Sequence, residues 1–521
     1  SIQSSKIGQH LIGLVSKIIR KSAYSDPIAD LSPELGFNII KVILLGTHFD
    51  RDAGKDNVFR RSLATIPTIN AECHLIHGDR LKRFMQAISS IPEGEDAVSL
   101  QIGNYSIDED ATAWLNGNKL FQRHAVIVGS TGSGKSWCVA KILEQVASLK
   151  SADAILFDIH GEYSTLQGDS FTHLKVAGPN DEMGDGMLFL PYWLLTYEEM
   201  LSLMLDRSDN NAPNQAMMFS SAVIDGKKQF LIDADKAEME ANITLDSPIP
   251  YNLDTLLSSL KSKDEEMVPG AKVGTEKQGP YFGKLTRFIQ RLETKQKDKR
   301  LNFMFASDVS LLSYNYMGEL CSKLMLPSVA GKKGVKIIDF SEVPSDILPL
   351  IVSLIARVIF SVQQWTTVEH RHPIAIFCDE AHLYIPANTE KSIDDASLVT
   401  FERISKEGRK YGIGLVVISQ RPSEVNRTVL SQSNNFIAMR LTNVDDQSVV
   451  KRLLPDSLGD YAEMLPILDI GEALVVGDAI RITPPNMKPR SATIDFWDEW
   501  SKETTAVDIS SAIESLRKQS K

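Results

Sequence analysis

Short apolar runs that end in polar or charged residues recur through the middle of the chain and predict buried strands. Two of them occupy residues 125–128 and 154–158, and others occupy 335–340, 374–378, 413–419 and 436–441. Apolar runs of about four to eight residues with polar ends are typical of strands covered on both faces. Apolar segments of helical length lie between some of them, at 137–146 and 347–365. This alternation predicts an α/β fold with a parallel sheet.

The first hundred residues follow a different pattern. Short apolar runs at 11–15, 42–45, 73–76 and 98–102 are separated by turn-forming residues. Several short strands joined by turns predict a small β-barrel or sandwich. His74 and His77 lie in this part, but no third ligand stands near them, so we do not interpret them as a metal site.

The segment from 196 to 330 is polar and helical in pattern and predicts a helical insertion. It contains a basic cluster that either contacts phosphates or forms a solvated helix face, and we favour the second interpretation. The cluster comprises Lys284, Arg287, Arg291, Lys295, Lys297, Lys299 and Arg300. Near the end, 473–476 and 479–482 resemble a hairpin. Residues 507–521 form a polar amphipathic helix that either reaches a neighbouring subunit or frays.

We therefore expect five regions along the chain. They are an N-terminal β-barrel at 1–107, the first part of a nucleotide-binding core at 108–195, the helical insertion at 196–330, the second part of the core at 331–490, and a C-terminal tail or brace helix at 491–521. A chain of 521 residues is long enough for about three domains.

Charge and cysteine content narrow the possible classes of protein. The formal net charge is −11, which excludes a globally basic nucleic-acid coat but not a local basic channel. The four cysteines form no CxxC pair, which argues against a zinc site or a disulfide framework and fits a reducing compartment. Arg357 and two serines interrupt the most apolar stretch, so we expect a buried helix there, no membrane association and a cytoplasmic protein.

The first predicted strand of the core is followed by a glycine-rich phosphate loop. It reads Gly129, Ser130, Thr131, Gly132, Ser133, Gly134, Lys135 and Ser136, and the next predicted helix follows it. Backbone N–H groups of such a loop converge on an anion at a helix N-terminus. Lys135 is expected to reach the β- and γ-phosphates of ATP, and the Ser136 hydroxyl to bind Mg²⁺. We assign Trp137, the next residue, to the same site.

Two carboxylates, Asp379 and Glu380, end the predicted strand at 374–378. We expect Asp379 to hold Mg²⁺ and Glu380 to orient and deprotonate an attacking water, which favours hydrolysis. Gln420 ends the strand at 413–419, where an amide can report the γ-phosphate. Asp158 and Glu162 occupy a similar place after the strand at 154–158.

Arginines matter because hydrolysis spreads charge over the γ-phosphate oxygens. Arg409 precedes the strand at 413–419, and Arg123 precedes the strand at 125–128. Each is either an arginine finger supplied to a neighbouring subunit or ordinary surface charge.

Taken together, these motifs resemble the HerA/FtsK superfamily of P-loop ATPases, and the HerA branch in particular. The resemblance rests on residues 120–124 leading into the loop, and on 157–163, 378–382, 408–412 and 418–423. It implies a RecA-like core, and the N-terminal β-rich part sits where that family carries its HAS-barrel. The resemblance implies that Arg123 and Arg409 are trans-acting or sensing groups. It also implies the roles stated above for Lys135, Ser136, Asp379, Glu380 and Gln420.

The resemblance further implies a hexameric ring that uses ATP to move or unwind double-stranded DNA. Relatives of this type act with a nuclease or a sirtuin-like NADase in DNA end processing or antiphage defence, and this chain has no such effector motif of its own. An alternative is a hexameric ATPase scaffold that assembles a partner effector with little motor activity. A conjugation-type coupling ATPase is disfavoured because no membrane segment is found, and a P-loop kinase because Glu380 and Gln420 would have no task.

Overall fold

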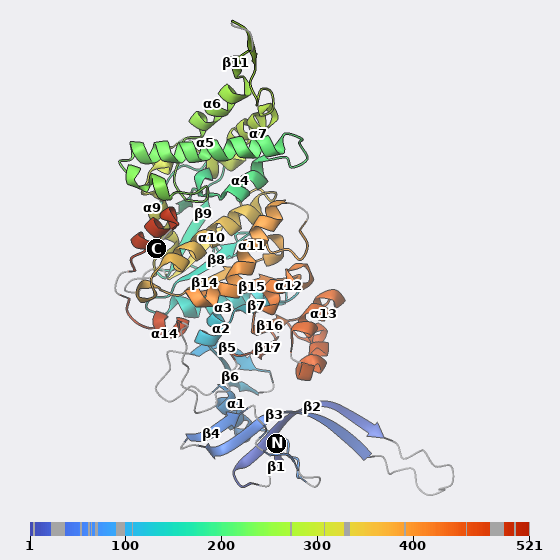
Figure 1. The fold of residues 1–521 in the computed structure, drawn as a ribbon. Helices are drawn as coiled ribbons and strands as arrows, with labels where there is room; N and C mark the ends of the chain where they lie inside the picture. The colour runs from blue at the N-terminus through green and yellow to red at the C-terminus, as the bar shows by residue number, and fades with distance from the viewer. Residues whose placement is uncertain are drawn as a thin grey trace, which may run out of the picture. The chain divides into compact units, whose positions relative to one another are not determined.

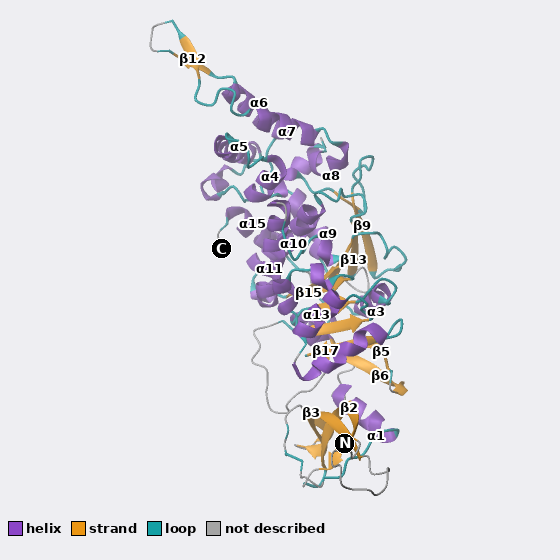
Figure 2. Ribbon diagram, turned by 90° about the vertical axis from the view of Figure 1, so that its right-hand side faces the viewer, coloured by secondary structure: helices purple, strands orange, loops and turns teal. Residues whose placement is uncertain are grey.

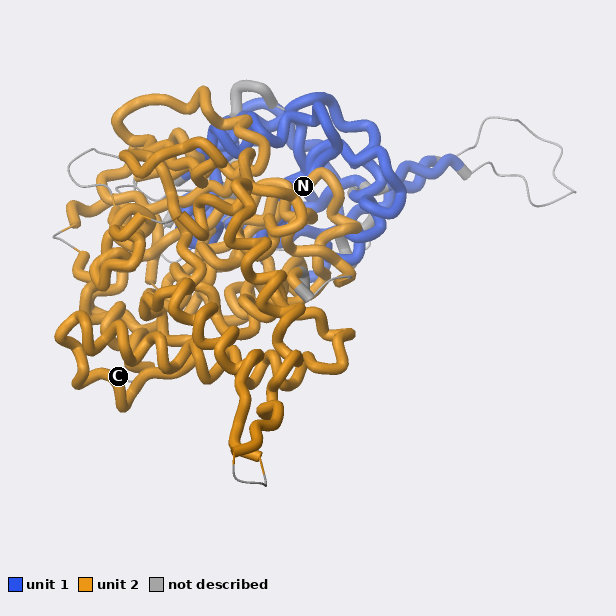
Figure 3. The backbone as a smooth tube through the Cα atoms, turned by 90° about the horizontal axis from the view of Figure 1, so that it is seen from above, with its two compact units in different colours: residues 1–120, 127–142, 434–491 blue, residues 121–126, 143–433, 492–521 orange. Residues whose placement is uncertain are grey.

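The chain divides into two compact units (Figure 3). Unit 1 comprises residues 1–120, 127–142 and 434–491, and unit 2 comprises 121–126, 143–433 and 492–521. Each unit is therefore assembled from segments that are far apart in the sequence. The computed structural model describes residues 1–3, 6–21, 37–52, 55–60, 63, 65–67, 71–89, 99–106, 108–270, 274–306, 308–327, 334–389, 392–454, 456–479, 494–504 and 507–519.

Unit 1 begins with an antiparallel four-stranded sheet of order β1-β2-β3-β4 (Figure 1). Leu11 and Ile12 of β2 are both buried, and Ile12 packs with Phe59 and with two residues of the following helix, Leu81 and Phe84. The elements are β1 (Ile2–Gln3), β2 (Gln9–Lys21), β3 (Phe37–Asp52), β4 (Lys55–Arg60), α1 (Asp79–Ser89), β5 (Ser99–Tyr105) and β6 (Asp108–Asn116).

The expected β-rich N-terminal part is confirmed, but a closed barrel is not. β1 and β4 are the edges of their sheet, and β5 pairs with β6 in a separate two-stranded sheet. The predicted strand at 73–76 is wrong, because Cys73 forms only an isolated bridge with Ile2. Leu75 is 81% exposed, and Ile76 packs on the core of the N-terminal sheet without pairing as a strand.

The rest of unit 1 carries the glycine loop. The elements that lie wholly or partly in this unit are α2 (Gly117–Gln122), β7 (Ala125–Val128), α3 (Lys135–Ala147), β16 (Asn435–Met439), α13 (Val444–Leu453), a 3₁₀ segment (Asp456–Ile467) and β17 (Ala473–Gly477). β16 pairs antiparallel with β17, with Ile437 opposite Val475. The predicted hairpin partner of β17 was 479–482; residues 480–482 lie outside the described part, and β17 pairs with β16 instead.

Unit 2 contains a parallel sheet of order β10-β9-β13-β8-β14-β15. Every residue of β8, β14 and β15 is buried, which is why their sequences are continuous apolar runs. The predicted strands at 154–158, 335–340, 374–378 and 413–419 are confirmed. The strands are β8 (Ala154–Asp158), β9 (Phe171–Val176), β10 (Met187–Leu188), β13 (Val335–Asp339), β14 (Ile374–Cys378) and β15 (Ile413–Ser419).

Parallel strands of one sheet need crossover connections, and long helices supply two of them. α10 (Leu348–Trp365) connects β13 to β14, and α11 (Ser392–Glu407) connects β14 to β15. The short helix α12 (Arg427–Ser431) follows β15. Among the described helices, α10 alone has the length and apolarity of a membrane span, and 78% of it is buried inside the structure. The prediction of a buried helix there is confirmed.

The segment between β10 and β13 is mostly helical, as predicted (Figure 2). Its elements are α4 (Tyr197–Met204), α5 (Ala212–Asp233), α6 (Leu253–Asp264), β11 (Met267–Pro269), β12 (Glu276–Gln278), α7 (Thr286–Gln296), α8 (Asn302–Phe305) and α9 (Tyr316–Met325). β11 and β12 form a small antiparallel hairpin that the polar pattern did not reveal.

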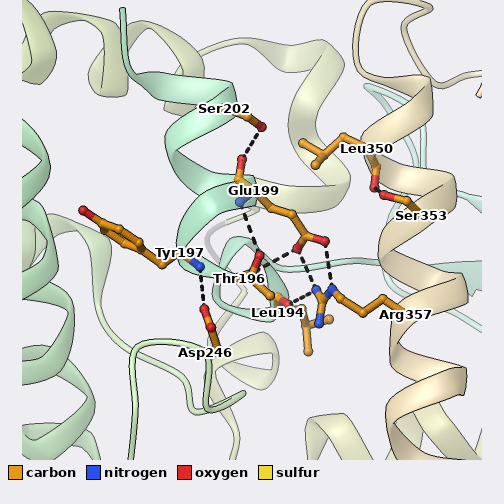
Figure 4. A network of polar contacts seen from close by, with 9 residues as sticks. All are labelled: Leu194, Thr196, Tyr197, Glu199, Ser202, Asp246, Leu350, Ser353 and Arg357. Atoms are coloured by element: carbon orange, nitrogen blue, oxygen red, sulfur yellow. Dashed lines mark hydrogen bonds and ion pairs between the residues drawn. The ribbon is translucent and has the colours of Figure 1, made fainter. Parts of the chain in front are cut away.

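A buried ion pair joins this helical segment to α10 (Figure 4). Arg357, which interrupts the apolar pattern of α10, donates to both carboxylate oxygens of Glu199 on α4 at 2.8 and 2.7 Å, and to the Leu194 carbonyl oxygen at 2.8 Å. Glu199 also closes a capping box with Thr196 at the start of α4. Arg357, the charged residue in an otherwise apolar helix, thus anchors α10 to the helical segment.

The C-terminal segment packs on its own chain in unit 2. α14 (Phe496–Trp500) and α15 (Ser510–Lys518) are its helices. Arg517 of α15 lies 3.8 Å over the Tyr314 ring and donates to the Tyr314 carbonyl oxygen, and its own carbonyl oxygen accepts from the Ser247 hydroxyl. The prediction of a helix is confirmed for 510–518, whereas a frayed tail is contradicted.

Candidate functional site

The glycine loop of unit 1 follows the buried strand β7 and leads directly into α3. Gly132 and Gly134 have φ values of +74° and +105°, in the left-handed region that residues with a Cβ rarely adopt. The Cys138 N–H donates to the Gly134 carbonyl oxygen at 3.0 Å and begins the helical ladder. The loop therefore leaves β7 and turns its backbone towards the N-terminus of a helix, the geometry that suits an anion.

Neighbouring segments of unit 1 hold this loop in shape. A Cβ on Gly129 would lie only 2.4 Å from the Ser133 hydroxyl and 2.9 Å from the Met439 Cβ, so the strand-to-loop junction tolerates only glycine. The Ser130 N–H donates to the Arg440 carbonyl oxygen at 2.8 Å, and the Gly471 N–H to the Ser133 carbonyl oxygen at 3.0 Å. The loop is thus pinned from both sides before any ligand binds.

Two of the predicted loop side chains differ in their surroundings. The Lys135 ammonium lies 3.5 Å from the Ser130 carbonyl oxygen and so folds over the loop. Trp137, which the sequence assigned to the nucleotide site, is 84% exposed on the first turn of α3. An exposed tryptophan of this size has its indole open to a ligand or another chain.

In unit 2, a tight turn follows β14 and carries the two carboxylates. Asp379 is buried, and Glu380 takes a left-handed conformation with φ 45° and ψ 43°. The Tyr384 hydroxyl donates to the Asp379 carbonyl oxygen at 2.8 Å, and the Leu383 N–H to the Glu380 carbonyl oxygen at 2.9 Å. A non-glycine residue held in this region costs about 1–3 kcal/mol, so the turn maintains a strained backbone at this point.

Negative charges gather around Asp379. Burial raises the pKa of Asp379 to about 7, and the charges of Glu380, Asp158 and Glu162 add to this rise. Such a carboxylate is one that a divalent cation would stabilise in its ionised form. No cluster of three or more acidic, histidine or cysteine ligands exists within the described ranges. This donor set suits Mg²⁺ held partly by phosphate and water better than a cation held by protein alone.

Asp158, at the end of β8, organises the next turn. Its two carboxylate oxygens accept the N–H groups of Glu162 and Tyr163, each at 3.0 Å. Burial raises the pKa of Asp158, and these hydrogen bonds oppose the rise. Its carboxylate therefore fixes the turn of residues 158–163.

The structure brings the segments carrying Arg123 and Arg409 close together in unit 2. His124 lies between them: its Nδ1 accepts from the Leu415 N–H at 2.9 Å and its Nε2 donates to the Ser405 carbonyl oxygen at 3.1 Å. Burial lowers the pKa of His124 to about 4, and the Arg409 charge lowers it further. The ring is therefore neutral near pH 7 and joins the segment of Arg123 to both flanks of the turn that carries Arg409.

The residues before Arg123 are anchored by the C-terminal segment, which the sequence did not indicate. Phe121 stacks on Trp497 with ring centroids 6.3 Å apart, and lies 5.2 Å from Trp500 and 6.0 Å from Phe377. Gln122 donates to the Ile494 carbonyl oxygen at 2.9 Å. The three aromatic residues within Phe496–Trp500 could have indicated from the sequence that this segment is buried, since a solvated tail seldom carries so many.

His382 and Ser419 were also missed as site residues, although both lie in motifs that drew attention. Gln420, the predicted sensor, directly follows Ser419 at the end of β15 and is partly buried. In the basic cluster of the helical segment, three of the seven residues lie within 4.0 Å of a carboxylate, and Arg287 is the most distant of them, at 4.0 Å from Asp209. Arg291 lies 2.6 Å from Asp206, and Arg300 lies 2.7 Å from Asp298.

A glycine loop between a buried strand and a helix, in an α/β fold with a parallel sheet, defines the class of P-loop nucleoside triphosphatases. A family model described as "Helicase HerA, central domain" matches residues 100–359. Within its class, the chain belongs to the HerA-like P-loop ATPases.

Curated relatives agree with this assignment. The "Probable helicase MJ1565" of Methanocaldococcus jannaschii is 25% identical over 388 residues, which cover 74% of this chain and 65% of that protein. The "Probable DNA double-strand break repair helicase HerA" of the same organism is 25% identical over 429 residues, covering 77% of this chain and 76% of that protein. The chain thus spans about two thirds to three quarters of these relatives.

Among solved structures, VirB4 of Thermoanaerobacter pseudethanolicus has a TM-score of 0.45 and 16% identity, covering 74% of this chain and 95% of that one.

Proposed function

We propose that the chain is an ATP-hydrolysing motor that translocates on or unwinds double-stranded DNA. The observation that carries the proposal is the phosphate loop, with its left-handed glycines and pinned backbone. Membership of the HerA-like family supports the choice of ATP and DNA, since the relatives are named as helicases. The buried, strained Asp379–Glu380 turn supports hydrolysis rather than binding alone.

Each candidate residue has a chemical role in this proposal. The loop N–H groups and Lys135 bind the phosphates, and the Ser136 hydroxyl and the Asp379 carboxylate hold Mg²⁺. Bound Mg²⁺ neutralises phosphate charge as it develops in the transition state. Glu380 orients and deprotonates the water, and Gln420 senses the γ-phosphate. Arg123 and Arg409 stabilise charge on the nucleotide of a neighbouring subunit in a ring that we propose to be hexameric.

The proposal extends to the partner protein, the cellular location and the role of the N-terminal region. A nuclease or sirtuin-like NADase acts with the ring, in antiphage defence or DNA end processing, and the complex is cytoplasmic. The N-terminal region, residues 1–107, takes the place of the HAS-barrel. These parts rest on the resemblance to the HerA branch.

The scaffold alternative, a hexameric ATPase that assembles an effector with little motor activity, has one observation in its favour. The net charge is −11, and two of the candidate phosphate-contacting arginines, Arg291 and Arg300, already bond carboxylates. Such arginines must break an ion pair before they can bind a phosphate, which weakens the basic cluster as a DNA contact.

Steady-state ATPase assays with and without linear duplex DNA separate the two functions. A motor shows hydrolysis that rises severalfold with duplex and falls with added salt, because phosphate contacts release counterions. A scaffold hydrolyses ATP at a rate that duplex leaves unchanged. The Lys135→Ala variant should neither bind nor hydrolyse ATP, and Glu380→Gln should bind ATP without turnover.

Lys141 offers a matched control for Lys135, since it lies on the same helix six positions later. Lys141→Ala should keep both nucleotide affinity and turnover. Normal turnover of Glu380→Gln would show that the general-base assignment is wrong, and normal ATP binding by Lys135→Ala would show that the loop is not the nucleotide site.

A further inference from the structure

The ends of three neighbouring strands meet around one histidine that the proposed mechanism leaves without a task. β14 lies between β8 and β15 in the sheet, so residues that follow these strands share one edge. His382, three residues after Asp379, is nearly buried there, with 9% of its side chain exposed. The charged groups that face it come from all three strand ends: Glu380, Arg421, Glu424 and His160.

Two contacts of one ring nitrogen join two of these strand ends. The His382 Nδ1 lies 3.3 Å from the Glu380 Oε2 and 3.3 Å from the Ser419 hydroxyl oxygen. The same hydroxyl accepts the Arg421 N–H at 3.0 Å and so fixes the peptide on either side of Gln420. A single imidazole therefore touches the carboxylate expected to activate water and the serine that precedes the expected sensor.

The Glu380 carboxylate has few other polar neighbours in the described part of the chain that could hold it in place. Its Oε2 is buried and makes no hydrogen bond among the described residues. A buried carboxylate oxygen without a donor is unfavourable, and an imidazole carrying hydrogen on Nδ1 supplies the nearby proton. The left-handed backbone of Glu380 directs its side chain to this place, so the strain in the turn and the histidine contact act on the same carboxylate.

The backbones of the two turns are also joined, which makes the side-chain contact part of a larger connection. The Asn426 N–H donates to the Ile385 carbonyl oxygen at 2.9 Å, and the Ala387 N–H to the Glu424 carbonyl oxygen at 2.7 Å. Movement of the segment after Gln420 is therefore transmitted to the turn that carries Glu380, with His382 between them.

We propose that His382 is a positioning residue that ties the Glu380 carboxylate to the end of β15, so that the water-activating group and the sensor Gln420 change position together. This inference rests on the proposed function, because it takes Glu380 as the general base. In this inference His382, the last residue of the Cys378–His382 motif, helps to make hydrolysis depend on which nucleotide is bound.

The test compares His382→Ala with His382→Asn in the full chain. The asparagine amide nitrogen reaches about as far as Nδ1 and can donate to a carboxylate. We expect His382→Ala to lower kcat about 10- to 100-fold with KM unchanged, because the buried Glu380 carboxylate loses the polar group held beside its Oε2. His382→Asn should restore most of the loss. His370→Ala, at an exposed histidine in a turn outside the site, should behave as wild type.

Non-additivity gives the sharper result. Because Glu380→Gln has no steady-state turnover, the two backgrounds are compared by residual single-turnover hydrolysis with enzyme in excess, and His382→Ala should not lower the residual rate of Glu380→Gln further, because the carboxylate it positions is gone. An equal loss in both backgrounds, or a change in KM as large as that in kcat, would overturn the inference.

A second readout does not depend on catalysis. Amide hydrogen exchange of peptides spanning 418–426 should rise in His382→Ala and in Glu380→Gln but not in His370→Ala. Unchanged exchange in His382→Ala would overturn the inference. A wild-type chain without ATPase activity would instead refute the proposed function, and exchange would still decide whether His382 ties the two turns.

Discussion

Removing Arg357 should loosen the helical segment of unit 2 from α10 without unfolding the chain. In Arg357→Met the aliphatic volume is largely retained, but Glu199, with 4% of its side chain exposed, loses both of its guanidinium hydrogen bonds. Stranding one member of a buried ion pair costs about 3–5 kcal/mol. Because 23% of the Arg357 side chain is exposed, water recovers part of this, and we expect about 3 kcal/mol.

Hydrogen exchange is the suitable assay, since a chain with two compact units need not unfold in one step. A loss of about 3 kcal/mol corresponds to a fall of roughly 10²-fold in the protection of α4 amides. The double variant Glu199→Leu and Arg357→Met should recover much of the protection, because no charge then remains buried. It should retain a residual loss of about 1 kcal/mol from the broken capping box.

The same helix carries its own control. Glu198, next to Glu199, pairs with Arg207 at 3.4 Å, and both side chains are well exposed. Arg207→Met should change protection by less than about 1 kcal/mol. The reasoning is refuted if Arg357→Met changes protection less than fivefold, or if the double variant loses the sum of the two single losses.

Three other perturbations have clear expected outcomes. Phe121→Ala should cost about 3–5 kcal/mol of local stability, measured as lost hydrogen-exchange protection of α14, and shift tryptophan emission to the red, and a cost below about 1 kcal/mol would contradict the docking of α14. Asp153 is buried just before β8 beside the Lys336 ammonium. Burial raises the pKa of Asp153 to about 6 from 3.8 although the Lys336 charge opposes the rise, so the unfolded chain releases this proton first and stability should fall as pH rises from about 4 to 6. Asp153→Asn should flatten that part of a denaturation profile, and an unchanged slope would point to another group. Mixed rings doped with Arg409→Ala should lose ATPase activity more than in proportion to the variant fraction, whereas proportional loss would place this arginine outside the subunit interface.

The parts of the fold that could be predicted are those whose local pattern has one explanation. β8, β14 and β15 are buried on both faces, so their sequences are continuous apolar runs and their bounds were found closely. β9 was missed because only two of its six residues, Leu174 and Val176, are buried, so its sequence is not a continuous apolar run. The N-terminal sheet was recognised as β-rich, yet its pairing order follows from contacts between distant residues, which periodicity does not report.

The same distinction applies to the candidate site. Loop residues 129–136 and the pair Asp379–Glu380 were identified because their spacing along the chain is itself the signal. His382 and Ser419 are 37 positions apart, and nothing in the local pattern of either indicates the other. The anchoring of Gln122 by Ile494 spans 372 positions and required the folded chain.

The docking of α14 onto Phe121 has a consequence for the order in which the protein is made. The Trp500 indole N–H donates to the Pro373 carbonyl oxygen at 3.0 Å, one residue before β14, while its ring packs on Phe121. A polypeptide emerges from the ribosome at roughly 5–20 residues per second. Phe121 and β14 must therefore wait for residues 494–500 before their aromatic contacts are complete. During that interval their apolar surface is open to chaperones and to other nascent chains.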